Sequence, residues 1–407
     1  MSSNQKISVC HLFGGVRALK IGKWQSQNGA MVHQVMMQDP APFIGYWKGC
    51  ITIHQNKTIT AIYELLSSKQ FLSVFKAYLF LYIFYIKLIA DVVRQNNIAI
   101  IHAHRHTGAA MAFISKKLFR LKNVKIIFDY HDPWSAEDLS DKNLIHKIAL
   151  RFYFYLERYL VNNSDLVITQ GEEQTQILLK RYPVPREKFI FTWNTADPLV
   201  FKPYKKERVL LRKQYGLEGK VALLYLGSII RYFGVDLIVK ALKNLVKKHP
   251  DVVFVSMGVI RDEPYWGEIK KEIAENKLEK YFVEIYPKSK SEIPMLISAC
   301  DVGLITHMRG SWICEVAIPT KLFEYMSCGL PIVSSDLPHI TQFILPYGAG
   351  VSFKSNDADS LANVLDKLIC DEKSITAMGL NARKAVEGKF NWGVEMQKVM
   401  DAYANLF

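Results

Sequence analysis

Short apolar runs alternate along this chain with longer amphipathic stretches, which is the pattern of strands followed by helices. In the first half, five such runs predict β-strands at Ile7–Phe13, Val32–Met37, Ile98–His102, Val124–Asp129 and Leu166–Thr169. Helical spacing predicts helices over much of 58–95, 107–120, 143–163 and 172–181. Strands that alternate with helices favour an α/β domain built on a parallel sheet.

The same alternation returns in the second half. The strands predicted there are Val221–Leu226, Val252–Met257, Tyr281–Tyr286, Val302–Ile305 and Ile332-Val333, with Gly227 and Gly258 following the first two. The predicted helices include Asp236–Lys248, Ser291–Ala299 and a final one near Trp392–Asn405. Because 407 residues exceed one typical core, we predict two doubly wound domains.

The segment Pro319–Val333 contains the most specific pattern for chemistry. Lys321 and Glu324 stand three residues apart, so they share one face of a short helix that Gly329 ends in a left-handed cap. A helix start that carries a lysine favours a diphosphate, and a carboxylate one turn later suits a ribose diol. The pattern indicates a nucleotide-sugar site, although an ordinary helix with solvated Lys and Glu has the same spacing.

This segment resembles the donor-site signature of the retaining glycosyltransferases of family 4, in the branch that reads P-[ST]-K-[LI]-[FY]-E-Y-[ML]. The resemblance implies the GT-B fold, in which two Rossmann-like doubly wound α/β domains face each other across a cleft. It places an acceptor-side domain at 1–200, a nucleotide-sugar-binding domain at 201–388, and a helix at 389–407 that crosses back. It also implies retaining transfer from a nucleotide-sugar substrate, with no cofactor and no metal.

The resemblance also assigns roles to residues. His131 matches the family histidine that faces the donor sugar, and Lys321 and Arg231 would stabilise charge on the leaving diphosphate, so these three are the predicted catalytic residues. The predicted donor-binding residues are Gly14, Gly15, Gly227, Glu315, Thr320, Lys321 and Glu324. The predicted acceptor-side residues are His104 and Asp132.

The chain departs from the family pattern in two places. The loop Gly227–Gly234 has Ser228 and Phe233 where the family has an arginine and a lysine for the diphosphate. Arg231 stands in the same loop and is expected to restore one cation. Val316 stands where the family has the first of two glutamates, and the adjacent Glu315 is the expected substitute.

Three alternating histidines, His102, His104 and His106, also match a metal-binding pattern if the strand that carries them continues. The resembling family has no catalytic metal here, so we expect none. Gly14 and Gly15 allow a ligand to approach the backbone closely, although a plain strand-to-helix turn also explains them.

The formal net charge of +14 is concentrated in the first half, where residues 1–200 hold 24 Lys and Arg against 14 Asp and Glu. The segment Lys87–Lys125 is the densest basic region, which favours an anionic membrane surface or nucleic acid. No RNA- or DNA-binding motif accompanies it, so we expect the membrane and no nucleic acid as partner. The aromatic segment Phe71–Val93 is interrupted by Lys76 and Lys87, so it is too short to span a bilayer. We expect a helix at the membrane interface, a core helix, or one with a face in each.

The six cysteines are scattered without a CxxC pair, and the polar N-terminus lacks a signal-peptide pattern. These features predict a cytoplasmic protein, peripheral on the inner face of the plasma membrane, acting on a lipid-linked or polysaccharide acceptor of the cell envelope. Three alternatives remain: a GT-B-fold sugar epimerase or phosphorylase, a non-catalytic subunit of a glycan-assembly complex, and an RNA-binding protein that uses Lys87–Lys125.

Overall fold

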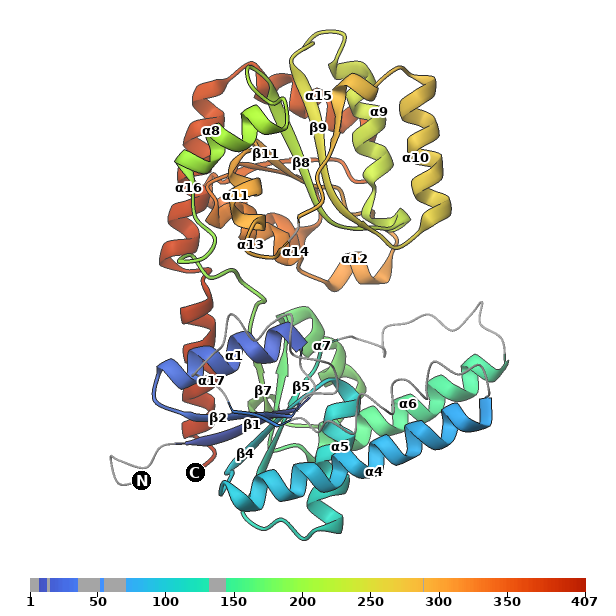
Figure 1. Ribbon diagram of the computed structural model, residues 1–407, viewed down its shortest axis with the longest axis vertical. Helices are drawn as coiled ribbons and strands as arrows, with labels where there is room; N and C mark the ends of the chain where they lie inside the picture. The colour runs from blue at the N-terminus through green and yellow to red at the C-terminus, as the bar shows by residue number, and fades with distance from the viewer. Residues whose placement is uncertain (1–6, 13–14, 36–51, 55–70, 132–143, 288) are drawn as a thin grey trace. The chain divides into compact units, whose positions relative to one another are not determined.

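A computed structural model describes residues 7–12, 15–35, 52–54, 71–131, 144–287 and 289–407 (Figure 1). The chain forms two compact units: unit 1 comprises Met1–Thr192 with Met396–Phe407, and unit 2 comprises Trp193–Glu395. The chain passes from unit 1 to unit 2 between Thr192 and Trp193, whereas the resemblance placed the boundary at residue 200. The C-terminal helix α17 (Trp392–Ala404) starts in unit 2 and continues into unit 1.

Unit 1 contains a parallel sheet with the order β3-β2-β1-β4-β5-β6-β7. Its strands are β1 (Ser8–Leu12), β2 (Met31–Val35), β3 (Thr52–His54), β4 (Ile100–His104), β5 (Lys125–Asp129), β6 (Leu166–Thr169) and β7 (Phe189–Phe191). The five predicted strands are all present, and β3 and β7 are additional. The order reverses between β1 and β4, which is where open parallel sheets bind ligands.

The helices of unit 1 cover the faces of this sheet (Figure 1). They are α1 (Gly15–Gln27), α4 (Phe71–Gln95), α5 (Arg105–Leu118), α6 (Leu144–Asn163) and α7 (Glu172–Arg181). α4 buries Tyr85 and Ile89 in the core and leaves Tyr82 and Ile83 exposed, so its described part has one face in the core and one in solvent. None of the described helices is long and apolar enough to cross a bilayer.

Unit 2 contains a second parallel sheet, with the order β10-β9-β8-β11-β12-β13. Its strands are β8 (Val221–Ile229), β9 (Val252–Ile260), β10 (Phe282–Glu284), β11 (Val302–Ile305), β12 (Ile332–Ser335) and β13 (Gly350–Phe353). β8 and β9 continue past the glycines expected to follow their ends, because Gly227 pairs with Gly258 and the ladder extends to Ile229 and Ile260. Two parallel-sheet α/β domains confirm the predicted fold class.

Helices cover both faces of this second sheet, and each layer has its own apolar core. They are α8 (Lys205–Gln214), α9 (Val235–Leu245), α10 (Glu263–Glu275), α11 (Ile293–Ser298), α12 (Trp312–Val316), α13 (Thr320–Ser327), α14 (Pro338–Thr341), α15 (Ala358–Ile369) and α16 (Glu372–Gly388). One core involves α11, α13 and α16, and the other involves α9, α10 and α15. The order reverses between β8 and β11, so these two strands define the ligand-binding edge of unit 2.

Candidate functional site

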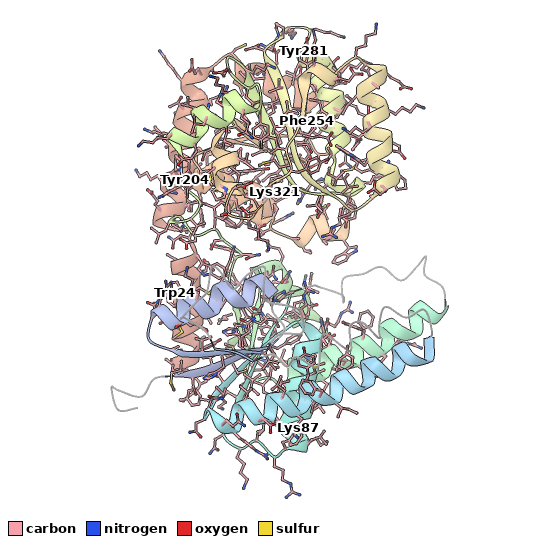
Figure 2. All side chains as sticks on the ribbon, in the orientation of Figure 1. Trp24, Lys87, Tyr204, Phe254, Tyr281 and Lys321 are labelled. Carbon is pink, nitrogen blue, oxygen red and sulfur yellow. The ribbon has the colours of Figure 1, made fainter. Side chains whose placement is uncertain are left out.

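Helix α13 presents Lys321 toward the interior of unit 2 (Figure 2). The helix begins after Pro319, which has an extended backbone and provides no side-chain cap, and it ends before Gly329, whose φ of 76° is the left-handed cap predicted from the sequence. Its anchor is apolar and consists of the buried residues Leu322, Phe323, Tyr325 and Met326. In the first turn of α13 the Leu322 N–H donates to the Pro319 carbonyl at 3.1 Å, and the positive end of the helix dipole lies at Thr320 and Lys321.

The Lys321 ammonium is buried without a hydrogen-bond partner. The residue is only 7% exposed, and its Nζ lies 4.0 Å from the centre of the Tyr225 ring. A Cβ atom at Gly227 would come within 3.6 Å of this Nζ, so the glycine keeps the space beside the ammonium open. Burial lowers the pKa of Lys321 from 10.5 to about 7, even though Glu324 one turn later favours the charged form.

The loop between β8 and α9 also lies beside Lys321. Phe233, in the place of the family lysine, lies 5.6 Å from Lys321 Nζ. Arg231 points elsewhere: its guanidinium donates two hydrogen bonds of 2.8 Å to the Glu268 carboxylate and lies over the Tyr265 ring. In this structure Arg231 is thus paired with Glu268 rather than brought to Lys321, and its role at the diphosphate stays a prediction.

The other predicted donor residues occupy the loop and helices around α13. Thr320 is the exposed first residue of α13, and Glu324 is half-buried one turn beyond Lys321. Glu315 lies in α12, where its Oε1 accepts a hydrogen bond of 3.1 Å from the Gly310 N–H. Glu315 therefore stabilises the loop before α12 in this structure, and its contact with a sugar stays a prediction.

His307 is a further buried residue of this region that was not among the individually predicted site residues. It follows β11, is 3% exposed, and has no hydrogen-bond partner at either ring nitrogen. Its ring stacks on Phe233, with ring centres 4.6 Å apart. Burial, together with the positive charges of Lys321 and His339, holds the pKa of His307 well below its usual range. Its place directly after the apolar strand Val302–Ile305 was the available signal.

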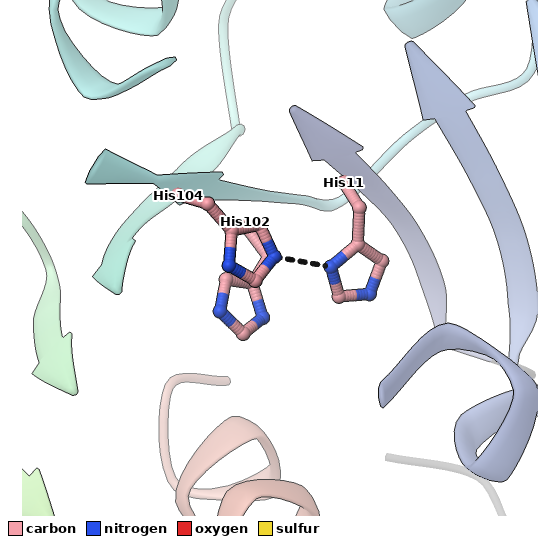
Figure 3. Close-up of side chains that lie close together, drawn as sticks. All are labelled: His11, His102 and His104. Carbon is pink, nitrogen blue, oxygen red and sulfur yellow. Dashed lines mark hydrogen bonds between the residues drawn. The ribbon is translucent and has the colours of Figure 1, made fainter. Parts of the chain in front are cut away.

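Unit 1 gathers histidines at the equivalent edge of its own sheet. His11 comes from β1, and His102 and His104 come from β4, so all three meet at the reversal point (Figure 3). His11 Nδ1 lies 3.1 Å from His104 Nε2, and His11 Nε2 lies 2.8 Å from the side-chain amide of Gln25. The rings are fully buried, and burial lowers the pKa of His11 to about 3.

Asp129, at the end of β5, organises these histidines. Its Oδ2 forms hydrogen bonds with Arg17 Nε at 2.9 Å and His102 Nε2 at 3.2 Å, and His104 Nδ1 lies 3.1 Å from the same oxygen. Burial alone would raise the pKa of this carboxyl, but Arg17 and the histidines hold it well below its usual range. A proton on His104 Nδ1 can be donated to this carboxylate, because a carboxylate only accepts hydrogen bonds.

The predicted catalytic and acceptor-side histidines adjoin this network. His131 Nε2 lies 3.2 Å from His104 Nδ1, and the His131 side chain is 10% exposed. His106 belongs to a different group, because its Nε2 lies 3.0 Å from Glu157 Oε2. Gly15 is the first residue of α1, whereas Gly14 and Asp132 lie outside the described residues.

The three buried histidines lie close enough to be tested as metal ligands, with ring nitrogens within 4.8 Å of one another. However, His102 and His104 stack with an interplanar angle of 11° and ring centres 4.4 Å apart. A metal must lie near the plane of each ligating ring, and two parallel stacked planes share no such point. As they are arranged, His102 and His104 do not form a common metal site. A second group, His104, Asp129 and His131, is also within metal-ligand reach.

Comparison with known proteins agrees with this geometry. Residues 60–198 match the family model "Glycosyltransferase Family 4", and residues 207–385 match "Glycosyl transferases group 1". The chain belongs to the glycosyltransferases of GT-B fold. A glycosyltransferase from Rickettsia africae superposes with a TM-score of 0.75 at 15% identity, covering 99% of both chains. Anabaena HepE in complex with UDP-glucose gives a TM-score of 0.74 at 16% identity, covering 98% of this chain and 100% of HepE.

A curated relative adds a sequence match. The D-inositol 3-phosphate glycosyltransferase of Stackebrandtia nassauensis is 24% identical over 258 residues, which are 61% of this chain and 56% of that enzyme. The structure of this glycosyltransferase brings Lys321, Gly227, Phe233 and His307 together in unit 2. It places His104 and His131 together in unit 1.

Replacing Lys321 tests whether its buried ammonium lowers the free energy of unfolding. We expect Lys321→Met to stabilise the unliganded protein by about 1–3 kcal/mol, because it removes a buried ammonium that has two aromatic neighbours but no hydrogen-bond partner. Between pH 7 and pH 10.5 the lysine is protonated in the unfolded chain but not in the folded protein. The free energy of unfolding of the wild type therefore rises as the pH rises through this range. The advantage of the variant is therefore greatest below pH 7 and shrinks as the pH rises.

Denaturant unfolding at pH 6 and pH 9 measures this difference. Lys354→Met, at a side chain that is 77% exposed, is the matched control and should change little. A Lys321→Met variant that is less stable than the wild type at both pH values would show that the ammonium stabilises the fold.

Proposed function

We propose that this glycosyltransferase binds a nucleotide-sugar in unit 2 and transfers its sugar with retention of anomeric configuration and without a metal ion. The observation that carries the proposal is the buried Lys321 ammonium beside Gly227 and the first turn of α13. A buried cation without a partner is unfavourable until an anion reaches it. The diphosphate of a nucleotide-sugar is such an anion, and Anabaena HepE, which shares the fold, has been solved with UDP-glucose.

The proposed chemistry follows from the direction in which charge moves. The bond between the anomeric carbon and the diphosphate oxygen breaks, and its electron pair leaves with the diphosphate. Lys321 Nζ and the N–H groups at the start of α13 stabilise this developing negative charge. They thereby perform the role that Mg²⁺ plays in other transferases. The acceptor hydroxyl approaches on the face that the diphosphate leaves, and the departing phosphate takes its proton.

Glu324 completes the proposed donor site. It stands one turn after Lys321 on α13, and its carboxylate is suited to accept hydrogen bonds from the two hydroxyl groups of a ribose. The nucleotide-sugar is a substrate, so the proposal requires no cofactor. The relatives named above are glycosyltransferases, which favours this function over an epimerase, a phosphorylase or an RNA-binding protein.

Unit 1 supplies the acceptor side of the proposal. Asp129 and His104 position the His131 ring, which is expected to orient the transferred sugar. We assign the acceptor to lipid-linked or polysaccharide glycans of the cell envelope, and the protein to a peripheral position on a membrane. The exposed aromatic and basic surface of α5 and α6 supports this assignment.

That surface consists of large apolar side chains beside cations. On α6, Phe152 and Tyr155 are each 71% exposed, and Arg151 and Arg158 are exposed on the same helix. On α5, Leu118 is 67% exposed, and Lys116 and Lys117 occupy the last turn. Aromatic rings at headgroup depth with cations near anionic phosphates are the two components of interfacial binding.

A nucleotide screen tests the donor site. We expect one of UDP, GDP and ADP, and its matching nucleotide-sugar, to raise the thermal transition in EDTA-containing buffer. At a hundred times Kd the ligand stabilises the fold by about 2.7 kcal/mol, which is a readable shift. Lys321→Met and Glu324→Ala should abolish the shift, whereas Glu372→Ala, at the exposed start of α16, should retain it.

A shift that needs added Mg²⁺ would refute metal independence. The absence of a shift with every nucleotide and nucleotide-sugar would refute the donor site, and would favour the non-catalytic subunit instead.

Vesicle sedimentation tests the membrane surface. We expect the double variant Phe152→Ser, Tyr155→Ser to bind vesicles containing phosphatidylserine at least about tenfold more weakly, because each ring loses its buried apolar area. The double variant Val209→Ser, Leu210→Ser removes two equally exposed apolar side chains from α8 and is the matched control. Equal binding by both variants would place the membrane contact elsewhere or remove it.

A further inference from the structure

His307 lies at the ligand-binding edge of unit 2 with its hydrogen-bonding groups unused. It follows β11, the strand that neighbours β8 where the sheet order reverses. Both ring nitrogens are buried and lack a partner. Buried polar groups without partners are rare because each costs free energy, so an imidazole with two of them indicates a ligand or a function.

The backbone around His307 is held firmly while its ring nitrogens stay free. Ser335 Oγ donates to the His307 carbonyl at 2.7 Å, and Thr306 Oγ1 donates to the Phe233 carbonyl at 2.7 Å. The Met308 N–H donates to the Tyr232 carbonyl at 2.9 Å. These bonds join β11 to the loop before α9, so the imidazole has a fixed position before any ligand arrives.

Phe233 packs against the His307 ring. It occupies the place of the lysine in the loop that the resembling family uses for the diphosphate. Here its ring stacks face to face on His307, with an interplanar angle of 17°, and lies near the Lys321 ammonium. A phenyl ring cannot donate to a phosphate, but it orients an imidazole that can.

We propose that His307 donates a hydrogen bond to the donor diphosphate and supplies the contact that Phe233 cannot make. The inference rests on the proposed function, because it requires a nucleotide-sugar in unit 2. Burial disfavours a charge on the His307 ring, and the positive charges of Lys321 in α13 and His339 in α14 disfavour it further. The imidazole is therefore neutral in the unliganded protein and offers one N–H to a phosphate oxygen.

Calorimetric titration with UDP, GDP and ADP, and with uridine, guanosine and adenosine, tests this role. For the nucleotide that the wild type binds, His307→Leu should weaken binding by about tenfold to a hundredfold, which corresponds to a lost hydrogen bond to a charged group. Binding of the matching nucleoside, which has no phosphate, should be unchanged. His307→Gln retains an N–H donor and should lose less.

A compensating substitution separates this role from a structural one. Phe233→Lys in the His307→Leu background restores the lysine at the place where the family has it, and should recover part of the lost affinity. Because the His307 nitrogens have no partners in the fold, His307→Leu should unfold no earlier than the wild type. His249→Leu, at a histidine paired with Asp366, is the binding control.

Two results would overturn the inference. One is a His307→Leu variant that binds the nucleotide as tightly as the wild type. The other is an equal loss for the nucleotide and its nucleoside, which would show a general disturbance of the site. A wild type that binds no nucleotide at all contradicts the proposed function itself, and is thereby distinguished from a failure of His307 alone.

Discussion

The second unit is arranged around one buried ammonium group. Lys321 lies on a helix whose apolar side chains are anchored in a core, and the lysine itself is only 7% exposed. The ammonium lies over the Tyr225 ring and beside Gly227, which has no side chain there, but neither residue gives it a hydrogen bond. Burial accordingly lowers the pKa of Lys321 to about 7. Under the proposed function, an anion that reaches the ammonium would offset this cost, and the cost removed would add to the affinity.

In unit 1, by contrast, the buried charge is paired. Asp129 is as deeply buried as Lys321, but its Oδ2 is met by Arg17, His102 and His104. A carboxylate paired in this way holds neighbouring rings in one tautomer and one orientation. The outcome is a rigid edge of the sheet from which His131 reaches the surface. Unit 1 thus holds a buried charge that is already paired, whereas the buried ammonium of unit 2 has no hydrogen-bond partner.

Most of the fold followed from local patterns. Leu166–Thr169 and Val302–Ile305 have the predicted bounds, because central parallel strands are apolar runs with polar ends. β8 exceeded its prediction because pairing with β9 carries the ladder through Gly227, which no local signal reveals. The contacts of the site residues were harder to predict, because they too depend on residues far apart in the sequence. Arg231 pairs with Glu268 on a helix far along the chain, and the free nitrogens of His307 are a property of packing rather than of sequence.

Proton uptake on donor binding tests the central claim most directly. Titration of the preferred nucleotide-sugar at pH 8, in buffers with different ionisation enthalpies, counts the protons taken up. A nucleotide-sugar has no phosphate group that titrates near neutral pH, so the protein must supply the change. With a Lys321 pKa of about 7 in the free protein and a charged lysine in the complex, we predict uptake of close to one proton at pH 8, falling toward zero below pH 6. Tight binding without proton uptake at pH 8 would show that Lys321 is already charged, and would contradict the account.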